Sequence, residues 1–132
     1  MIGMSIWIEF NPNPAGRRVG DCAVRAIAAA LGVDWEQAFN LLADAAYQMG
    51  DMPSSDSVWG AVLRQHGFYR RAVSMACPDC YTAADFARDH PRGVYVLGFG
   101  GHVATLRDAR LLDSWDSSGL SPQFYWYRKK EA

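Results

Sequence analysis

The residue best placed for nucleophilic chemistry is Cys22, which follows Gly20 and Asp21 where a loop meets a predicted helix over 22–31. The first N–H groups of a helix have no partner within the helix, and the helix dipole places partial positive charge there. Both effects lower the pKa of a thiol and stabilise its thiolate. The same N–H groups can stabilise an oxyanion. The sequence therefore predicts a nucleophile at Cys22, and a small buried cysteine is the alternative interpretation.

A base is predicted at His102, which opens a predicted strand over 102–107 directly after two glycines. A second predicted strand over 110–115 pairs with it in an antiparallel hairpin. Trp115 then falls opposite His102, and Asp113 is its diagonal neighbour, roughly 7–8 Å away. This spacing suits a carboxylate that holds the imidazole in one tautomer, with Trp115 shielding the contact from water.

The register of this hairpin decides which carboxylate orients the imidazole. A slip of one residue moves every side chain of a strand to the other face. A three-residue turn would put Ser114 and Asp116 on the face of His102, and Asp116 would then be the orienting acid. We favour Asp113 because it is embedded in an apolar strand, whereas Asp116 precedes the turn-forming Ser-Ser-Gly at 117–119.

The rest of the chain predicts helices first and strands afterwards. Cap residues at Asp34, Ser55 and Thr82 open three further helices. Strands are expected over 1–10, 68–73, 94–99, 102–107, 110–115 and 123–128. Helices followed by a run of strands indicate an α+β architecture. We expect one domain over residues 1–132, with N-terminal helices packed on a C-terminal antiparallel sheet.

Composition narrows the class of protein. The 132 residues are half hydrophobic, enough for a core without metal or disulfide support. The net charge of -1 argues against a nucleic-acid partner, because a surface that follows phosphates carries a basic excess. No apolar run reaches the roughly 18 residues of a membrane span, and no signal-peptide pattern opens the chain. Three cysteines, an odd count, indicate a reducing, cytoplasmic setting.

Three motifs follow one another along the chain: the cysteine at a helix start, a Gly-His that opens a strand, and Asp-Ser-Trp at 113–115. This order resembles papain-like cysteine peptidases, whose relatives carry Asn-Ser-Trp at the last position. Asp-Cys at 21–22 is similar to the Asp-Cys-Gly of bacteriocin-processing peptidases. Cys-Ala-Val-Arg-Ala at 22–26 is similar to the nucleophile helix of ovarian-tumour-type deubiquitinases. The pattern also looks like small uncharacterised proteins of bacteria and their phages. The resemblance implies a papain-like cysteine-protease fold.

One position departs from the papain pattern. Papain and the bacteriocin-processing enzymes carry a Gln six residues before the nucleophile, where it donates to the oxyanion, and this chain has Gly16 there. Asn13 or Asn11 would replace it if the loop folds back, and backbone N–H groups are the alternative. The ovarian-tumour pattern has an Asp three residues before the cysteine, where this chain has Val19.

Four residues are predicted to bind substrate or the oxyanion: Asn13, Asp21, Arg25 and Trp115. Arg25 lies one helical turn after Cys22 and suits a substrate carboxylate or phosphate. An ion pair between Arg25 and Asp21 is the more frequent arrangement for such an arginine.

Cys77 and Cys80 have the CxxC spacing found in zinc and redox sites. A zinc site needs about four ligands, and the chain has no second CxxC, so we expect no metal, no cofactor and two free thiols in a loop. A redox role would require a thioredoxin-like βαβ context, which this sequence does not predict.

The expected function is thiol-dependent hydrolysis of a peptide or isopeptide-like bond in a peptide or protein substrate, by Cys22, His102 and Asp113. The alternative is a non-catalytic binding module on the same fold, which sequesters a small anionic ligand or blocks a host protein. Gly16 in place of the Gln, and the neighbouring Arg17 and Arg18, motivate this alternative.

Overall fold

The computed structural model describes residues 5–74 and 80–128. Within these ranges the chain forms four helices and six strands. The helices are α1 (Cys22–Leu31), α2 (Trp35–Met49), α3 (Asp56–Gln65) and α4 (Ala83–Asp89). The strands are β1 (Trp7–Glu9), β2 (Phe68–Ala72), β3 (Val94–Gly98), β4 (Val103–Arg107), β5 (Arg110–Asp113) and β6 (Phe124–Arg128). The α+β class predicted from the order of elements is confirmed.

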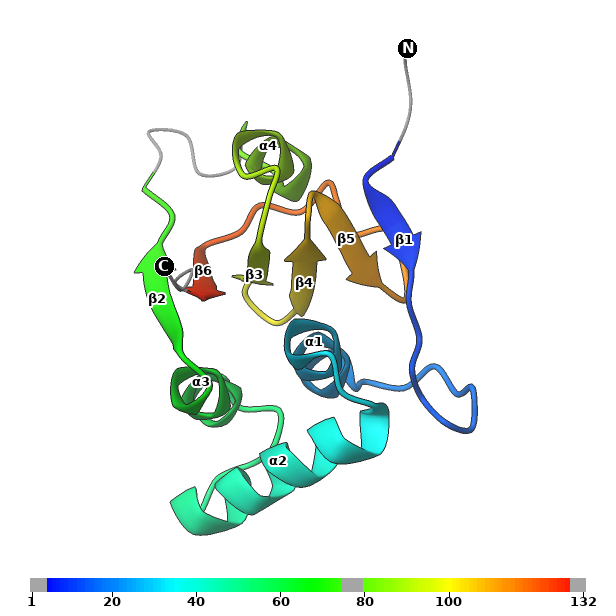
Figure 1. Ribbon diagram of the computed structural model, residues 1–132, viewed down its shortest axis with the longest axis vertical. Coiled ribbons are helices and arrows are strands. Elements are labelled where there is room, and N and C mark those ends of the chain that lie inside the picture. Colours follow the sequence, from blue (N-terminus) through cyan, green and yellow to red (C-terminus); the bar gives the residue numbers. More distant parts are fainter. Residues whose placement is uncertain (1–4, 75–79, 129–132) are drawn as a thin grey trace.

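The described strands form one sheet in the order β1-β5-β4-β3-β6-β2 (Figure 1). β1 is parallel to β5, and the other neighbouring strands are antiparallel. The prediction of a purely antiparallel, C-terminal sheet is therefore wrong, since the sheet is mixed and β1 and β2 come from earlier in the chain. β1 pairs with β5 and β2 pairs with β6, although the partners are far apart in sequence. Which edge of the sheet such a strand joins depends on the path of the whole chain, and no local sequence pattern encodes it.

Helices cover both faces of the sheet, with α1 and α4 on opposite sides (Figure 1). On the α1 face, Ile27 of α1 and Trp59 of α3 lie in one apolar core with Val96 and Trp126 of the sheet. α2 packs outside, against α1 and α3. On the other face, Phe86 of α4 packs in a second core with strand residues. The N-terminal helices thus share one face, and α4 is alone on the other.

Two side chains of β4 bind backbone carbonyl groups of α1 and set the position of that helix along the strand. Thr105 Oγ1 donates to the carbonyl oxygen of Ala26 at 2.7 Å. Arg107 donates to the carbonyl oxygen of Ala29 at 2.9 Å. Buried polar groups need partners, so these bonds favour one placement of the helix over others. They bring the N-terminus of α1 to the N-terminal end of β4.

The hairpin of β4 and β5 has the register expected to make Asp113 the neighbour of His102, with Thr105 opposite Leu112. Its turn has two residues, Asp108 and Ala109, with φ of 49° and 66°. A left-handed conformation costs a non-glycine residue about 1–2 kcal/mol. Two hydrogen bonds at 2.9 Å between Asp108 and the backbone of Gly93 offset part of that cost.

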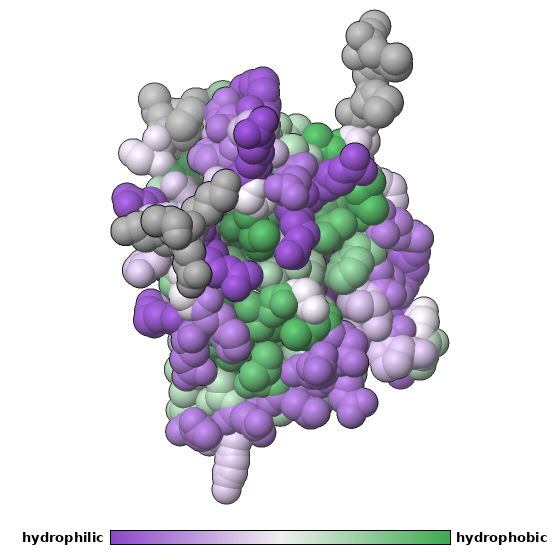
Figure 2. Space-filling view, in the orientation of Figure 1, coloured by the Kyte–Doolittle hydropathy of each residue, from purple (hydrophilic) through white to green (hydrophobic). Residues whose placement is uncertain are grey.

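Local signals at the helix ends hold in part, since Ser55 is the N-cap of α3 but its side chain makes no capping hydrogen bond. The capping boxes predicted at Asp34 and Thr82 are present. Gly32 and Gly50 end α1 and α2 in the left-handed conformation. Figure 2 shows apolar side chains in the middle of the visible face with polar side chains around them. Among the described helices, none combines the length and apolar character that crossing a membrane requires.

Candidate active site

Cys22 is the first residue of α1, and a groove of about 470 Å³ opens beside it. Three segments that are distant in sequence form its walls: the loop before α1, the residues before β4 and the residues after β5. The lining includes Arg18, Val19, Gly20, His102, Ser114 and Trp115. Three of the sequence-predicted residues, His102, Trp115 and Arg25, thus share a groove with the thiol.

The side chain of His102 and the backbone of Val103 both act on the pKa of the Cys22 thiol. Burial raises the pKa of this thiol, but hydrogen bonding to these two groups and the positive charges of His102 and Arg25 outweigh burial. The pKa of Cys22 is therefore below its ordinary value. A lowered pKa favours the thiolate, which is the nucleophilic form of cysteine.

His102 lies between this thiol and a carboxylate. Its Nε2 is 2.7 Å from Oδ2 of Asp113, which leaves Nδ1 as the ring nitrogen for the thiol of Cys22. Burial lowers the pKa of the imidazole, but the bonds to Asp113 and Cys22 outweigh it and raise the pKa to about 9. These contacts therefore shift both groups toward their charged forms, a thiolate and an imidazolium.

Two aromatic rings restrict the orientation of the His102 ring. The centroid of Trp115 is 4.8 Å from that of His102, and the centroid of Phe99 is 5.9 Å away. Trp115 is itself 45% exposed, whereas the His102 side chain is 14% exposed. Trp115 thus covers the imidazole from solvent, as its predicted place opposite His102 suggested.

Asp113 is fully buried, and its carboxylate takes part in four hydrogen bonds. Oδ2 accepts from His102 and from Ser117 Oγ at 2.6 Å. Oδ1 accepts from the N–H of Ser114 at 2.8 Å and from Arg25 at 3.0 Å. Burial raises the pKa of this carboxyl, but the bonds to His102 and Ser117 and the charges of His102 and Arg25 outweigh it and lower the pKa. Asp113 is therefore held as a carboxylate.

Arg25 is buried and joins two carboxylates. Its guanidinium donates to Asp21 Oδ1 at 2.6 Å and to Asp113 Oδ1 at 3.0 Å. The second oxygen of Asp21 accepts from Trp35 Nε1 at 2.9 Å. The ion pair between Arg25 and Asp21, considered the more frequent arrangement, is confirmed. Both residues were also predicted as substrate ligands, and in this structure their charged atoms are engaged within the protein.

This engagement leaves the N-terminus of α1 without a side-chain cap. Asp21 occupies the N-cap position, yet its side chain makes no hydrogen bond to the helix. The N–H groups in the first turn of α1, which begins at Cys22, have no partner within the helix. They are the donors expected for an oxyanion that forms beside the thiol.

Asn13 and Asp116 lie apart from the imidazole. Asn13 Oδ1 accepts from the N–H of Ala15 at 2.8 Å, which stabilises a turn. Asp116 Oδ1 accepts from the backbone and hydroxyl of Ser118 at 3.1 Å and 2.6 Å. Asn13 is not among the described residues that line the groove. The observed register thus brings Asp113 to His102 and leaves Asp116 in turn contacts.

Three supporting residues went unrecognised in the sequence: Ser117, Phe99 and Trp35. Ser117 is fully buried and follows Asp113 by four residues, within a Ser-Ser-Gly run that local chemistry assigns to a turn. Phe99 ends a predicted strand three residues before His102, and this spacing does not predict a contact between the two rings. Trp35 opens α2, and its partly buried indole N–H needs an acceptor.

The CxxC segment is described only in part. Cys80 is disulfide-bonded, so the expectation of two free thiols there is wrong. Cys77 lies outside the described residues. Within residues 5–74 and 80–128, Cys22 is the free cysteine, and no group of three or more metal-ligating side chains gathers.

Comparison with protein-family models, with curated proteins and with solved structures finds no significant match to this chain.

Proposed function

We propose that this protein is a cysteine hydrolase of papain-like architecture that cleaves a peptide or isopeptide-like bond. The observation that carries the proposal is that His102 lines the groove beside Cys22 and lies 2.7 Å from the buried carboxylate of Asp113. A thiol with a lowered pKa, a base at hydrogen-bond distance and a group that orients the base are the parts of a nucleophilic site.

In the proposed reaction, the Cys22 thiolate attacks the carbonyl carbon of the scissile bond and forms a tetrahedral oxyanion. The C–N bond then breaks as His102 gives its proton to the leaving amine, and the acyl group remains on Cys22 as a thioester. His102, now neutral, takes a proton from water, and the resulting hydroxide attacks the thioester. The carboxylic acid product leaves, and the ion pair is restored.

The residues around the triad account for its orientation and charge. Asp113 holds His102 with Nδ1 toward the thiol, and its carboxylate stabilises the imidazolium. Arg25 and Ser117 hold Asp113 from two other directions. The first-turn N–H groups of α1 are the proposed oxyanion donors in place of a side-chain amide. A cytoplasmic setting remains our prediction from the sequence, and the disulfide at Cys80 argues against a strongly reducing one.

The alternative of an anion-binding module finds less support. Its candidate cations are Arg25, which bridges two buried carboxylates, and the exposed Arg17 and Arg18, of which Arg17 does not line the groove. Arg18 donates to Glu9 at 2.9 Å and to the carbonyl oxygen of Ser114 at 2.5 Å. A ligand anion would have to displace the buried partners of Arg25 before it gained that charge, whereas the exposed pair of Arg18 and Glu9 is a weak competitor.

The test is the pH dependence of Cys22 alkylation by iodoacetamide, followed by peptide mass mapping. The wild type is expected to react with a midpoint below the ordinary thiol pKa of about 8.5, and His102→Ala is expected to return the midpoint to about 8.5. A wild-type midpoint near the ordinary value, unchanged by His102→Ala, would contradict the proposal. A fluorogenic peptide-amide library, with Cys22→Ala as the blank, then tests turnover.

A further inference from the structure

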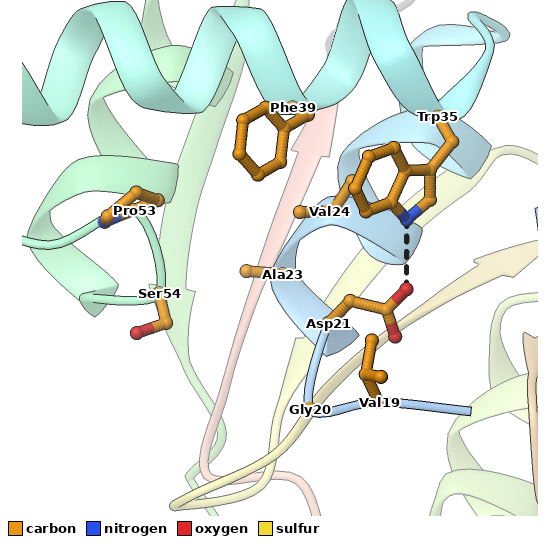
Figure 3. Close-up of a pocket in the computed structure, with 9 residues that line it drawn as sticks. All are labelled: Val19, Gly20, Asp21, Ala23, Val24, Trp35, Phe39, Pro53 and Ser54. Atoms are coloured by element: carbon orange, nitrogen blue, oxygen red, sulfur yellow. Dashed lines mark hydrogen bonds between the residues drawn. The ribbon is translucent and has the colours of Figure 1, made fainter. Parts of the chain in front are cut away.

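A second groove, of about 300 Å³, adjoins the groove that contains Cys22. Figure 3 shows the residues that line this second groove. The two grooves share Val19 and Gly20, the residues that lead into the helix of the nucleophile. The second groove also includes Ala23 and Val24, which directly follow Cys22. A chain that lies across the start of α1 would therefore contact both grooves.

The walls of this groove are apolar. The rings of Trp35 and Phe39 project from α2 toward Ala23 and Val24 of α1, and Pro53 lies on another side of the space (Figure 3). The groove has one charged side chain, Asp21, whose oxygens are already bound by Arg25 and Trp35. A charged ligand would find no free counter-charge on these walls, whereas an apolar group would lose little on leaving water.

Two of the wall residues are large apolar side chains with substantial exposure. Phe39 is 41% exposed and Val19 is 40% exposed. The ring of Phe39 stacks on Trp35 with centroids 5.1 Å apart, so its position is defined by packing. A contiguous exposed apolar surface beside a polar reactive site is a common feature of ligand grooves.

We propose that this groove binds a large apolar side chain, aromatic or branched aliphatic, of the peptide substrate beside the scissile bond. The assignment rests on the proposed function, because continuity with the catalytic groove selects a peptide as the occupant. The volume is at the lower end of the range of small-molecule pockets, about 300–1,000 Å³. That size suits one side chain better than a large cofactor.

The experiment compares two alkylating probes that differ by one apolar arm. Iodoacetamide and N-(2-phenylethyl)iodoacetamide both form a thioether as the Cys22 thiolate displaces iodide. The ratio of their second-order rate constants at Cys22, read by peptide mass mapping, reports binding of the arm and cancels the intrinsic reactivity of the thiol. In the wild type we expect the phenylethyl probe to react about tenfold faster, the scale of discrimination by an apolar pocket.

Two groove variants and one matched control complete the design. Phe39→Ser and Val19→Ser are each expected to bring the ratio toward one. Tyr47→Ser changes another exposed aromatic side chain of α2, 80% exposed and outside the groove, and is expected to keep the wild-type ratio. Because Phe39 and Val19 are both partly exposed and lie on different segments, either variant can carry the test if the other fails to fold.

Three results would overturn the proposal: a ratio near one in the wild type, an unchanged ratio in both groove variants, or a concentration-dependent dimer that Phe39→Ser dissociates. The last result would assign the groove to a second copy of the chain. Failure of the proposed function has a different signature, namely ordinary iodoacetamide reactivity of Cys22 that His102→Ala does not change. The probe ratio still reports on the groove in that case.

Discussion

His102 and His90 both pack against phenylalanine rings, yet their ring nitrogens meet different partners. The ring of His90 stacks on Phe86 with centroids 3.9 Å apart, and His102 stacks on Phe99 at 5.9 Å. Nδ1 of His90 lies 2.9 Å from the carbonyl oxygen of Phe86, in its own helix. His102 instead contacts a carboxylate and a thiol from two distant segments.

This difference shows what an imidazole needs for acid–base chemistry. A backbone carbonyl fixes the ring of His90 but brings no charge, so the contact is structural. At His102 the carboxylate of Asp113 stabilises the charged ring, and Arg25 in turn holds that carboxylate. The two regions therefore differ in buried charge rather than in aromatic packing, and variants that remove one charge at a time separate these contributions.

The largest expected effect is on stability, from Arg25→Met. This variant leaves the buried carboxylates of Asp21 and Asp113 without their shared cation, and removing one partner of a buried ion pair costs about 3–5 kcal/mol. Urea unfolding measures the loss. Arg92→Met, an exposed arginine two residues after His90, is the matched control and is expected to stay within about 0.5 kcal/mol of wild type. If the two variants lowered the free energy of unfolding equally, the stabilising role of Arg25 between the two carboxylates would be contradicted.

His102→Ala is expected to slow alkylation of Cys22 by iodoacetamide at pH 6 by about tenfold to a hundredfold, because an ordinary thiol with a pKa near 8.5 is almost wholly protonated there. His90→Ala should leave this rate unchanged, since the ring of His90 contacts a carbonyl of its own helix. A slow rate in both variants would mean that folding, rather than the imidazole, controls the thiol.

Asp113→Asn is expected to make stability less dependent on pH in the acid range. The folded-state pKa of Asp113 lies below its unfolded value, so the carboxylate contributes stability above the unfolded pKa of about 3.9. That contribution is lost as the pH falls through the folded pKa. The free energy of unfolding of the wild type should therefore exceed that of Asp113→Asn most near neutral pH, and this difference should close below about pH 4.

Chemical denaturation at pH 7, 5, 4 and 3 measures this gap. Asp89→Asn is the counterpart beside His90, where an exposed carboxylate accepts from the Tyr81 hydroxyl at 2.7 Å. The free energy of unfolding of Asp89→Asn is expected to stay within about 0.5 kcal/mol of the wild-type value at each pH. A gap for Asp113→Asn that stays constant down to pH 3 would contradict the lowered pKa.

The smallest expected effect is the stability change in His90→Ala. The variant removes the stacked contact with Phe86, and an aromatic pair contributes about 0.5–1.5 kcal/mol beyond its buried area. Thermal unfolding should show a loss of about 1 kcal/mol. A loss as large as that of Arg25→Met would mean that aromatic packing matters as much as buried charge in this protein.

Local patterns were sufficient to predict the elements that carry the candidate site. The loop-to-helix transition at Cys22, the capping boxes at Asp34 and Thr82, and the Gly32 helix end all follow from interactions within a few residues. The β4–β5 register is the one that we favoured, with Asp113 rather than Asp116 on the face of His102, although the sequence left both open. These predictions hold because the interactions behind them span short stretches of chain.

The partners of those elements depend on tertiary structure. The sequence by itself determined that a cysteine begins a helix and that a histidine and an aspartate share a hairpin. It did not determine that β1 joins β5 in parallel, that Ser117 binds Asp113, or that Arg25 bridges two carboxylates. These contacts join segments through packing, or place a turn residue in the buried interior. The hydrogen bonds from β4 to α1 help to place the thiol beside His102. This placement is a tertiary property, because the position of a helix on a sheet depends on packing across the whole interface.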